Sequence, residues 1–169
     1  MDQFDFSTHL PLADLLLRLG LAAFCGLLIG FEREARDRPA GMRTHMLTAL
    51  AAALFAIIAI EMIAAFGTDG DKTQLDPIRV VEAVTAGVAF LAAGTIIQAR
   101  GSVKGLTTGA AMWLAGAVGL ACGAGFYAVA LLGTAFALLV LLPFKLMEDR
   151  LFSSEADKEQ TEAGKGKAG

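Results

Sequence analysis

The sequence predicts an all-α fold: a polytopic membrane protein built as a bundle of five transmembrane helices. Of the 169 residues, 56% are hydrophobic and only 18% are charged, and the mean hydropathy is +0.61. Soluble domains typically contain about 45–50% apolar and about 25% charged residues. The apolar residues are gathered into long runs between short polar loops, which is the pattern of membrane-spanning helices rather than of a large soluble core.

Five segments have the ~17–25 residues that a tilted spanning helix needs. They cover residues 12–31, 46–66, 77–98, 106–122 and 126–144. Pro11 suits the start of the first helix, Thr44 can cap the second, and Asp76 before Pro77 is typical of a capped helix start. Residues 1–11 are expected to be a short extracytoplasmic N-terminus without a cleavable signal, 12–150 the helical domain, and 151–169 a disordered cytoplasmic tail.

The distribution of Lys and Arg predicts the orientation of the bundle, because positive residues concentrate in cytoplasmic loops. The first ten residues contain neither Lys nor Arg, and the loop after the second segment is mainly acidic. The intervening loops and the tail carry the positive charges: Arg33, Arg36, Arg38 and Arg43, then Arg100 and Lys104, then Lys145 and Arg150. We therefore expect the N-terminus outside and the C-terminus in the cytoplasm.

Small residues inside the spans are interpreted as packing residues. Gly26 and Gly30 stand four positions apart, as do Gly119 and Gly123, a spacing that lets helix backbones approach closely in lipid. The two cysteines, Cys25 and Cys122, are also expected to be small packing residues. The predicted topology places them at opposite depths, so no disulfide between them is expected.

Charged residues within the spans form a predicted outer cluster. Arg18, Glu61 and Glu82 lie at similar depths on the outer side, with Asp76 just above them. A charge in a span needs a partner or a function. One interpretation is buried ion pairing among Arg18, Glu61 and Glu82. Another is a cation site in which Glu61, Asp76 and Glu82 are the metal ligands, with Mg²⁺ as the suggested cofactor. A third is that these side chains extend outward to the membrane interface without partners.

A second predicted cluster lies on the cytoplasmic side, where the first and third segments end and the second and fourth begin. It is a candidate binding site, and loop ordering with helix capping is the alternative interpretation. Its residues are Glu32, Arg33, Glu34, Arg43, Thr44, His45, Thr95, Thr107 and Thr108. Asp76 and Arg79 complete the candidate binding residues on the opposite side. The spacing of Glu32 and Arg36 is that of an ordinary helical ion pair.

Five strings, in order along the chain, together resemble the MgtC/SapB family of bacterial membrane proteins. They are GLLIGFERE, AGMRTH, LDPIRVVEAVTAGVAFLAAGTII, GLTTGAAMWLAGAVG and LACGAGFY. The resemblance covers roughly residues 15–142 and implies an inner-membrane location and a link to magnesium. The family's signature residues fall by position on Glu32, Arg33, Gly41, Arg43, Thr44, Asp76, Pro77, Arg79, Gly94, Gly105, Thr107, Thr108 and Trp113.

The chain also departs from the family pattern. Two glycines of the usual GIGFLGAG stretch are alanines here, in the run Gly87-Val88-Ala89-Phe90-Leu91-Ala92-Ala93-Gly94. Glu82 stands where the virulence-linked relatives have a smaller or uncharged residue. The soluble C-terminal domain of several members is not expected in this chain. These departures put a virulence role in doubt.

Two functions stay open from the sequence. The resemblance favours a protein of magnesium homeostasis or adaptation to low magnesium that regulates a membrane partner. The expected contacts are the lipid bilayer and either a membrane-protein partner or, by self-association, a second copy of the chain. The alternative is a transporter or channel for Mg²⁺ or another cation, since magnesium prefers oxygen ligands. An enzyme is not expected, because the spans contain no serine, no HExxH motif and no GxGD-type aspartate pair. Nor does any basic patch with interleaved aromatics suggest a nucleic-acid partner.

Overall fold

The computed structural model describes residues 8–66, 76–99 and 102–142, which form five helices and one short hairpin. The helices are α1 (Leu12–Glu34), α2 (Met42–Phe66), α3 (Pro77–Gly94), α4 (Leu106–Gly123) and α5 (Tyr127–Leu141). The strands are β1 (Ile97–Ala99) and β2 (Ser102–Lys104). Helices α1 to α4 are long and apolar enough to cross a membrane, and α5 is a shorter apolar helix of 15 residues. The predicted all-α polytopic membrane fold is confirmed.

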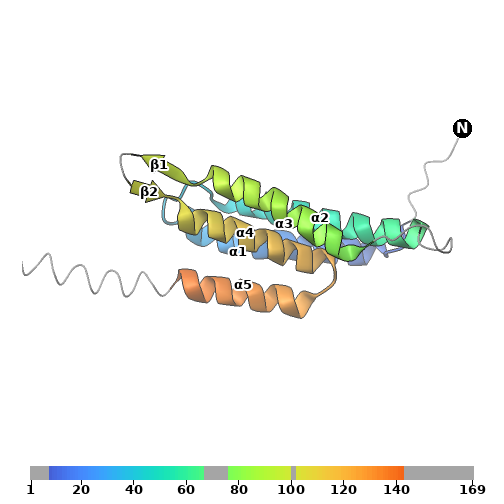
Figure 1. Ribbon diagram of the computed structural model, residues 1–169. Helices are drawn as coiled ribbons and strands as arrows, with labels where there is room; N and C mark the ends of the chain where they lie inside the picture. The colour runs from blue at the N-terminus through green and yellow to red at the C-terminus, as the bar shows by residue number, and fades with distance from the viewer. Residues whose placement is uncertain (1–7, 67–75, 100–101, 143–169) are drawn as a thin grey trace, which may run out of the picture.

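The helices alternate in direction along the chain, so that α1 and α3 end at one end of the bundle and α2 and α4 end at the other (Figure 1). The hairpin joins α3 to α4 at the end where α1 also finishes and α2 begins. We call this the inner end and the other the outer end, following the predicted orientation, which stays a prediction. The predicted tail from residue 151 and the last two residues of the predicted fifth segment, 143 and 144, lie outside the described residues.

Helix α4 is the centre of the bundle and contacts each of the other four helices. Ten of its 18 residues are buried, whereas only three of the 18 residues of α3 are. The core around α4 consists mainly of small residues from α1, α2, α4 and α5, among them Ala22, Cys25, Ala49, Ala115 and Ala130. Helix α3 is therefore a peripheral helix of the bundle, as is α5, which has four buried residues of 15.

Glycines allow the central helices to approach within backbone contact. A Cβ atom at Gly119 of α4 would lie 2.6 Å from the Cα of Ala49, and one at Gly123 would lie 2.7 Å from the Cα of Ala53. On α1, a Cβ at Gly26 would lie 2.7 Å from the carbonyl oxygen of His45. Real Cβ atoms do not approach other atoms so closely, so the predicted packing role of these glycines is confirmed.

Three boundaries of α1 to α3 differ from the prediction by three residues or more, the first being the end of α1, which lies at Glu34 rather than at residue 31. The third helix ends at Gly94 rather than at Gln98, because the chain turns there and enters the β-hairpin, with Ile97 opposite Lys104. Thr95 still has helical backbone angles as the C-cap of α3, and the β-branched Ile96 and Ile97 that follow it favour extended backbone. The second helix begins at Met42, so Thr44 lies inside its first turn and is not its cap. The cap comes from another helix, as described below.

The two cysteines were expected at opposite depths, and this was wrong. Cys25 of α1 and Cys122 of α4 are both fully buried in the same core cluster, as free thiols. The reason is helix length: α1 has 23 residues and α4 has 18, so the outer end of α4 lies beside the middle part of α1. Their predicted role as small packing residues agrees with this burial.

Candidate functional site

Five side chains meet at the inner end of the bundle, and we call them the inner polar cluster. Glu32 and Arg33 are in the last turn of α1, Arg36 follows that helix, His45 is in α2 and Thr108 is in α4. Four of the five are buried, with exposed fractions of 5% for Glu32, 3% for Arg33, 0% for His45 and 1% for Thr108. Charges are rarely buried to this degree unless they are paired.

The carboxylate of Glu32 is held between two guanidinium groups. Oε1 of Glu32 lies 2.5 Å from Nε of Arg36, and Oε2 lies 3.7 Å from Nη1 of Arg33. One negative and two positive charges give the three side chains a formal charge of +1. Glu32 is thus already neutralised by the protein itself.

The two arginines also connect α1 to other helices. Arg33 donates a hydrogen bond from Nη2 to Oγ1 of Thr108, over 2.9 Å, which ties α1 to α4. Arg36 donates from Nη2 to the carbonyl oxygen of Leu141, over 2.8 Å, which ties the end of α1 to the end of α5. The cluster therefore fixes three helices to one another at the inner end.

His45 completes the cluster without reaching another helix through a hydrogen bond. Its Nδ1 lies 2.9 Å from the carbonyl oxygen of Gly41, in the preceding turn of the same chain segment. A hydrogen on Nδ1 makes this a hydrogen bond and leaves Nε2 as an acceptor. Nε2 is buried and has no partner among the described residues. The backbone of His45 lies against Gly26 of α1, where a Cβ atom would be 2.7 Å from the His45 carbonyl oxygen.

Glu34 provides the cap of α2 that the sequence interpretation assigned to Thr44. Its Oε2 accepts a hydrogen bond of 2.8 Å from the backbone N–H of Met42, the first residue of α2. A carboxylate at a helix N-terminus satisfies a free N–H group and interacts favourably with the helix dipole. The side chain of Glu34 also covers Gly41, where a Cβ would clash with the carboxyl group.

The remaining predicted residues of this end do not join the cluster. Arg43, Thr44 and Thr107 are exposed. Thr95 donates from Oγ1 to the carbonyl oxygen of Ala92, over 2.7 Å, and so closes the end of α3. Of the nine predicted residues on this side, the structure brings together Glu32, Arg33, His45 and Thr108, with Glu34 beside them.

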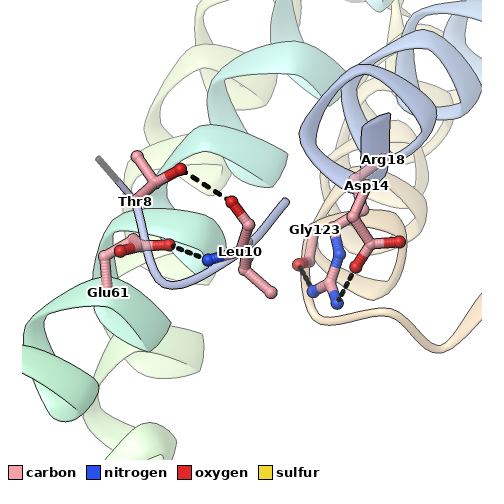
Figure 2. A network of polar contacts seen from close by, with 6 residues as sticks. All are labelled: Thr8, Leu10, Asp14, Arg18, Glu61 and Gly123. Atoms are coloured by element: carbon pink, nitrogen blue, oxygen red, sulfur yellow. Dashed lines mark hydrogen bonds and ion pairs between the residues drawn. The ribbon is translucent and has the colours of Figure 1, made fainter. Parts of the chain in front are cut away.

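At the outer end, the predicted ion-pair network is not formed. Arg18 pairs with Asp14, four residues earlier, at 3.1 Å, and donates from Nη1 to the carbonyl oxygen of Gly123, over 2.7 Å. Glu61 instead accepts hydrogen bonds of 2.9 Å from the backbone N–H groups of His9 and Leu10. Figure 2 shows two separate groups: Glu61 contacts the N-terminal segment, and Arg18 of α1 contacts Gly123 at the end of α4.

Asp76, Arg79 and Glu82, the other predicted residues of the outer end, do not form a common site either. Asp76 accepts a hydrogen bond of 2.9 Å from the N–H of Ile78 and is the predicted N-terminal cap of α3. Arg79 and Glu82 lie further along α3 and are exposed. Within the described ranges, no three His, Cys, Asp or Glu side chains lie close enough together to hold a metal ion. Metal binding by Glu61, Asp76 and Glu82 stays a prediction.

The sequence interpretation did not include one hydrogen-bond donor and two acceptors of these sites. Arg36 was recognised only as a helical partner of Glu32, and the carbonyl oxygens of Gly123 and Leu141 were not considered. A backbone carbonyl carries no signal in the sequence, because every residue has one. For Arg36, the available signal was its spacing of four residues from Glu32.

Comparison with known proteins gives consistent matches. Residues 19–150 match the model of the MgtC family. The Escherichia coli K12 protein named "Putative magnesium transporter YhiD" is 38% identical over 141 residues, covering 83% of this chain and 65% of that protein. Protein SrpB of Synechococcus elongatus is 39% identical over 142 residues, covering 78% of this chain and 75% of SrpB. Protein MgtC of Brucella abortus is 39% identical over 130 residues, covering 77% and 51%.

The matches cover only part of several relatives. The chain spans 65% of the length of YhiD and about half, 51%, of the length of the Brucella protein. No solved structure matches this chain.

Proposed function

The chain belongs to the MgtC family, and from this premise we propose that it is an inner-membrane protein of magnesium homeostasis that regulates a membrane partner. The observation that carries the proposal is the state of Glu32, the buried carboxylate of the inner polar cluster. Its oxygens face two arginines, at 2.5 Å and 3.7 Å. The cluster has the properties of a set of contacts that hold α1, α4 and α5 together, which we call the lock, rather than those of a cation site.

Electrostatics favour this interpretation over magnesium binding at the inner end. Mg²⁺ is held by carboxylates and other oxygen ligands, and it keeps several of its waters. A buried site with one carboxylate and two guanidinium groups has a formal charge of +1 and repels a divalent cation. The hydroxyl of Thr108 is also engaged, as the acceptor of the hydrogen bond from Arg33.

The interior between the two ends also favours regulation over conduction by a single chain. Among the described residues, the buried polar side chains outside the inner polar cluster are Thr48 and Thr134. Each of their hydroxyls donates over 2.8 Å to the carbonyl oxygen four residues earlier in its own helix. The rest of the core consists of alanines, cysteines and aliphatic residues. A hydrated ion would cross this interior without polar ligands.

Transport is the second candidate, and the printed name of YhiD favours it. It would require a pathway between several chains, because the interior of one chain is apolar. The carboxylates that such a pathway could use are Glu61 and Glu82, at the outer end.

The experiment that separates the two functions measures flux and growth with the same protein. The full chain is reconstituted into proteoliposomes that contain a magnesium-sensitive dye. It is also expressed in a bacterium that lacks its own MgtC-family gene and grows poorly at low magnesium. A regulator restores growth, and its liposomes take up no more Mg²⁺ than empty ones. Flux above that of empty liposomes, reduced in the variants Glu61→Gln and Glu82→Gln, would overturn the regulatory proposal.

The variant Thr108→Val tests the role of the inner polar cluster in the same growth assay. It removes the acceptor of the Arg33 hydrogen bond without changing any charge, and Thr107→Val is the matched control on the exposed neighbour. We expect growth at low magnesium to be impaired by Thr108→Val and unaffected by Thr107→Val. Equal growth of the two variants at equal protein levels would contradict the proposal that the lock is needed for regulation.

A further inference from the structure

The face of α3 that points away from the bundle has an unusual composition for a helix in contact with lipid. The buried residues of α3 are Val84, Val88 and Ala92, which mark the side that packs on α4 and α2. The other side carries residues at helical spacing that are all exposed, and we call it the outer face of α3: Arg79, Glu82, Ala83, Ala86, Gly87, Phe90, Ala93 and Gly94. Ala83 and Gly87 stand at the edge of this face and also line an open groove between α3 and α2.

Small residues dominate this face, and they leave room for another helix. A Cβ atom at Gly87 or at Gly94 would meet nothing within 4 Å. Phe90 is the one large apolar residue on the face and is 80% exposed. Small residues of this kind are enriched where transmembrane helices contact one another, because they let two backbones approach closely.

Two opposite charges lie at the outer end of the same face. Neither Arg79 nor Glu82 forms an ion pair with another described side chain, although the two residues lie only three positions apart on the same helix. Glu82 lies five residues into the span, about 7.5 Å along the helix axis. A carboxylate at that depth normally faces protein rather than lipid and has a partner.

We propose that the outer face of α3 is the interface with a second copy of this chain. Two copies inserted with the same orientation are related by an axis perpendicular to the membrane, so their α3 helices run parallel. In this arrangement Arg79 of each copy faces Glu82 of the other, since the two residues differ by only about 4.5 Å in depth. The charge pattern is therefore complementary to itself, which favours a second copy over a partner of different sequence.

The same geometry places the small residues and Phe90 in contact. Below the charges, Ala83, Ala86 and Gly87 of one helix lie against their counterparts, and the two Phe90 rings cover the gap that small residues leave. The proposal does not depend on the proposed function, because a regulator and a transporter can both be dimers.

The test measures dimerisation of the full chain in lipid vesicles by energy transfer between donor-labelled and acceptor-labelled protein, over a series of protein-to-lipid ratios. We expect the wild-type chain to dimerise. The variants Glu82→Arg and Arg79→Glu should each weaken the dimer by about tenfold or more, because both reciprocal pairs become repulsive. The double variant Arg79→Glu with Glu82→Arg should restore dimerisation to within about twofold of wild type, since the exchange recreates both pairs.

A glycine pair provides the control for effects on folding. Gly87→Leu adds bulk to the proposed interface, and Gly20→Leu adds the same bulk on α1, where a Cβ also meets nothing within 4 Å. We expect Gly87→Leu to weaken the dimer and Gly20→Leu to leave it unchanged, with both variants equally folded by helix content.

Cysteine crosslinking locates the interface independently, because the native Cys25 and Cys122 are fully buried. An Ala83→Cys variant should crosslink between copies in the vesicles, and Ala128→Cys, exposed on α5, should not. A monomeric wild-type chain at all ratios would overturn the proposal. So would a double charge exchange that fails to restore the dimer, or crosslinking at residue 128 and not at residue 83.

Discussion

Arg33 of α1 donates a hydrogen bond to Thr108 of α4 across 2.9 Å, with both side chains almost completely buried. The two residues are 75 positions apart in the chain. The bond joins the helix that carries most of the charged residues of the inner end to the helix at the centre of the bundle. The contribution of this hydrogen bond to the free energy of unfolding can be measured because Thr107, the exposed neighbour of Thr108, provides a control.

We expect Thr108→Val to destabilise the protein and Thr107→Val to have almost no effect. The first change leaves a buried guanidinium N–H of Arg33 without its acceptor, which costs about 1–3 kcal/mol. The second removes an exposed hydroxyl, and such substitutions are usually within about 0.5 kcal/mol of neutral. The measurement is reversible unfolding in mixed micelles as the fraction of denaturing detergent rises. If the two valine variants unfold at the same fraction, the Arg33–Thr108 bond contributes nothing to stability.

Arg18 provides a second prediction, which also tests the ion-pair network expected from the sequence. Its contacts are the carboxylate of Asp14 and the carbonyl oxygen of Gly123. Arg18→Met should therefore cost about 1–2 kcal/mol, because a partly buried carbonyl at the end of α4 loses its donor.

The partner of Arg18 can be identified by double-mutant cycles. We expect a measurable coupling energy between Arg18→Met and Asp14→Asn, and a coupling within about 0.5 kcal/mol of zero between Arg18→Met and Glu82→Gln. A large coupling to Glu82 would show that the outer charges of α1 and α3 interact directly in the membrane, as the sequence interpretation had it.

How far the sequence alone leads is clear from these same residues. The five helices were predictable because an apolar run of spanning length has few other structures available to it in a membrane. The pairing of Glu32 with Arg36 was visible as a helical spacing. What the sequence did not contain was the burial of Glu32 and the reach of Arg33 to Thr108, because both depend on how α1 and α4 pack.

The outer end shows the same limit for a different reason. Arg18, Glu61 and Glu82 were grouped because their depths are similar, but depth does not determine which way a side chain points around its helix axis. Two of the three found backbone partners, the carbonyl of Gly123 for Arg18 and the N–H groups of His9 and Leu10 for Glu61. Backbone groups are present at every position and so give no pattern to read.

The capping of α2 leads to a third prediction. Glu34→Ala removes the acceptor of the Met42 N–H, and the loss of such a cap costs about 1 kcal/mol. Glu34→Gln keeps a carbonyl oxygen in reach and should recover part of that loss, the remainder being the interaction of charge with the helix dipole. The check is amide hydrogen exchange at Met42 together with overall stability. Thr44→Ala is the control for the cap that was first expected, and it should leave both quantities unchanged.

The contact between α2 and α4 gives the last prediction, and glycine substitutions test it directly. At Gly119 an added Cβ would overlap the backbone of Ala49, 2.6 Å from its Cα, whereas at Gly20 it would meet nothing within 4 Å. Gly119→Ala should therefore force α2 and α4 apart and cost about 1–3 kcal/mol, as overpacking in a tight core does. Gly20→Ala should be neutral or slightly stabilising, because alanine has the higher helix propensity. If Gly119→Ala proved as stable as Gly20→Ala, the close approach of α2 and α4 described here would be wrong, and with it the central position of α4 in the bundle.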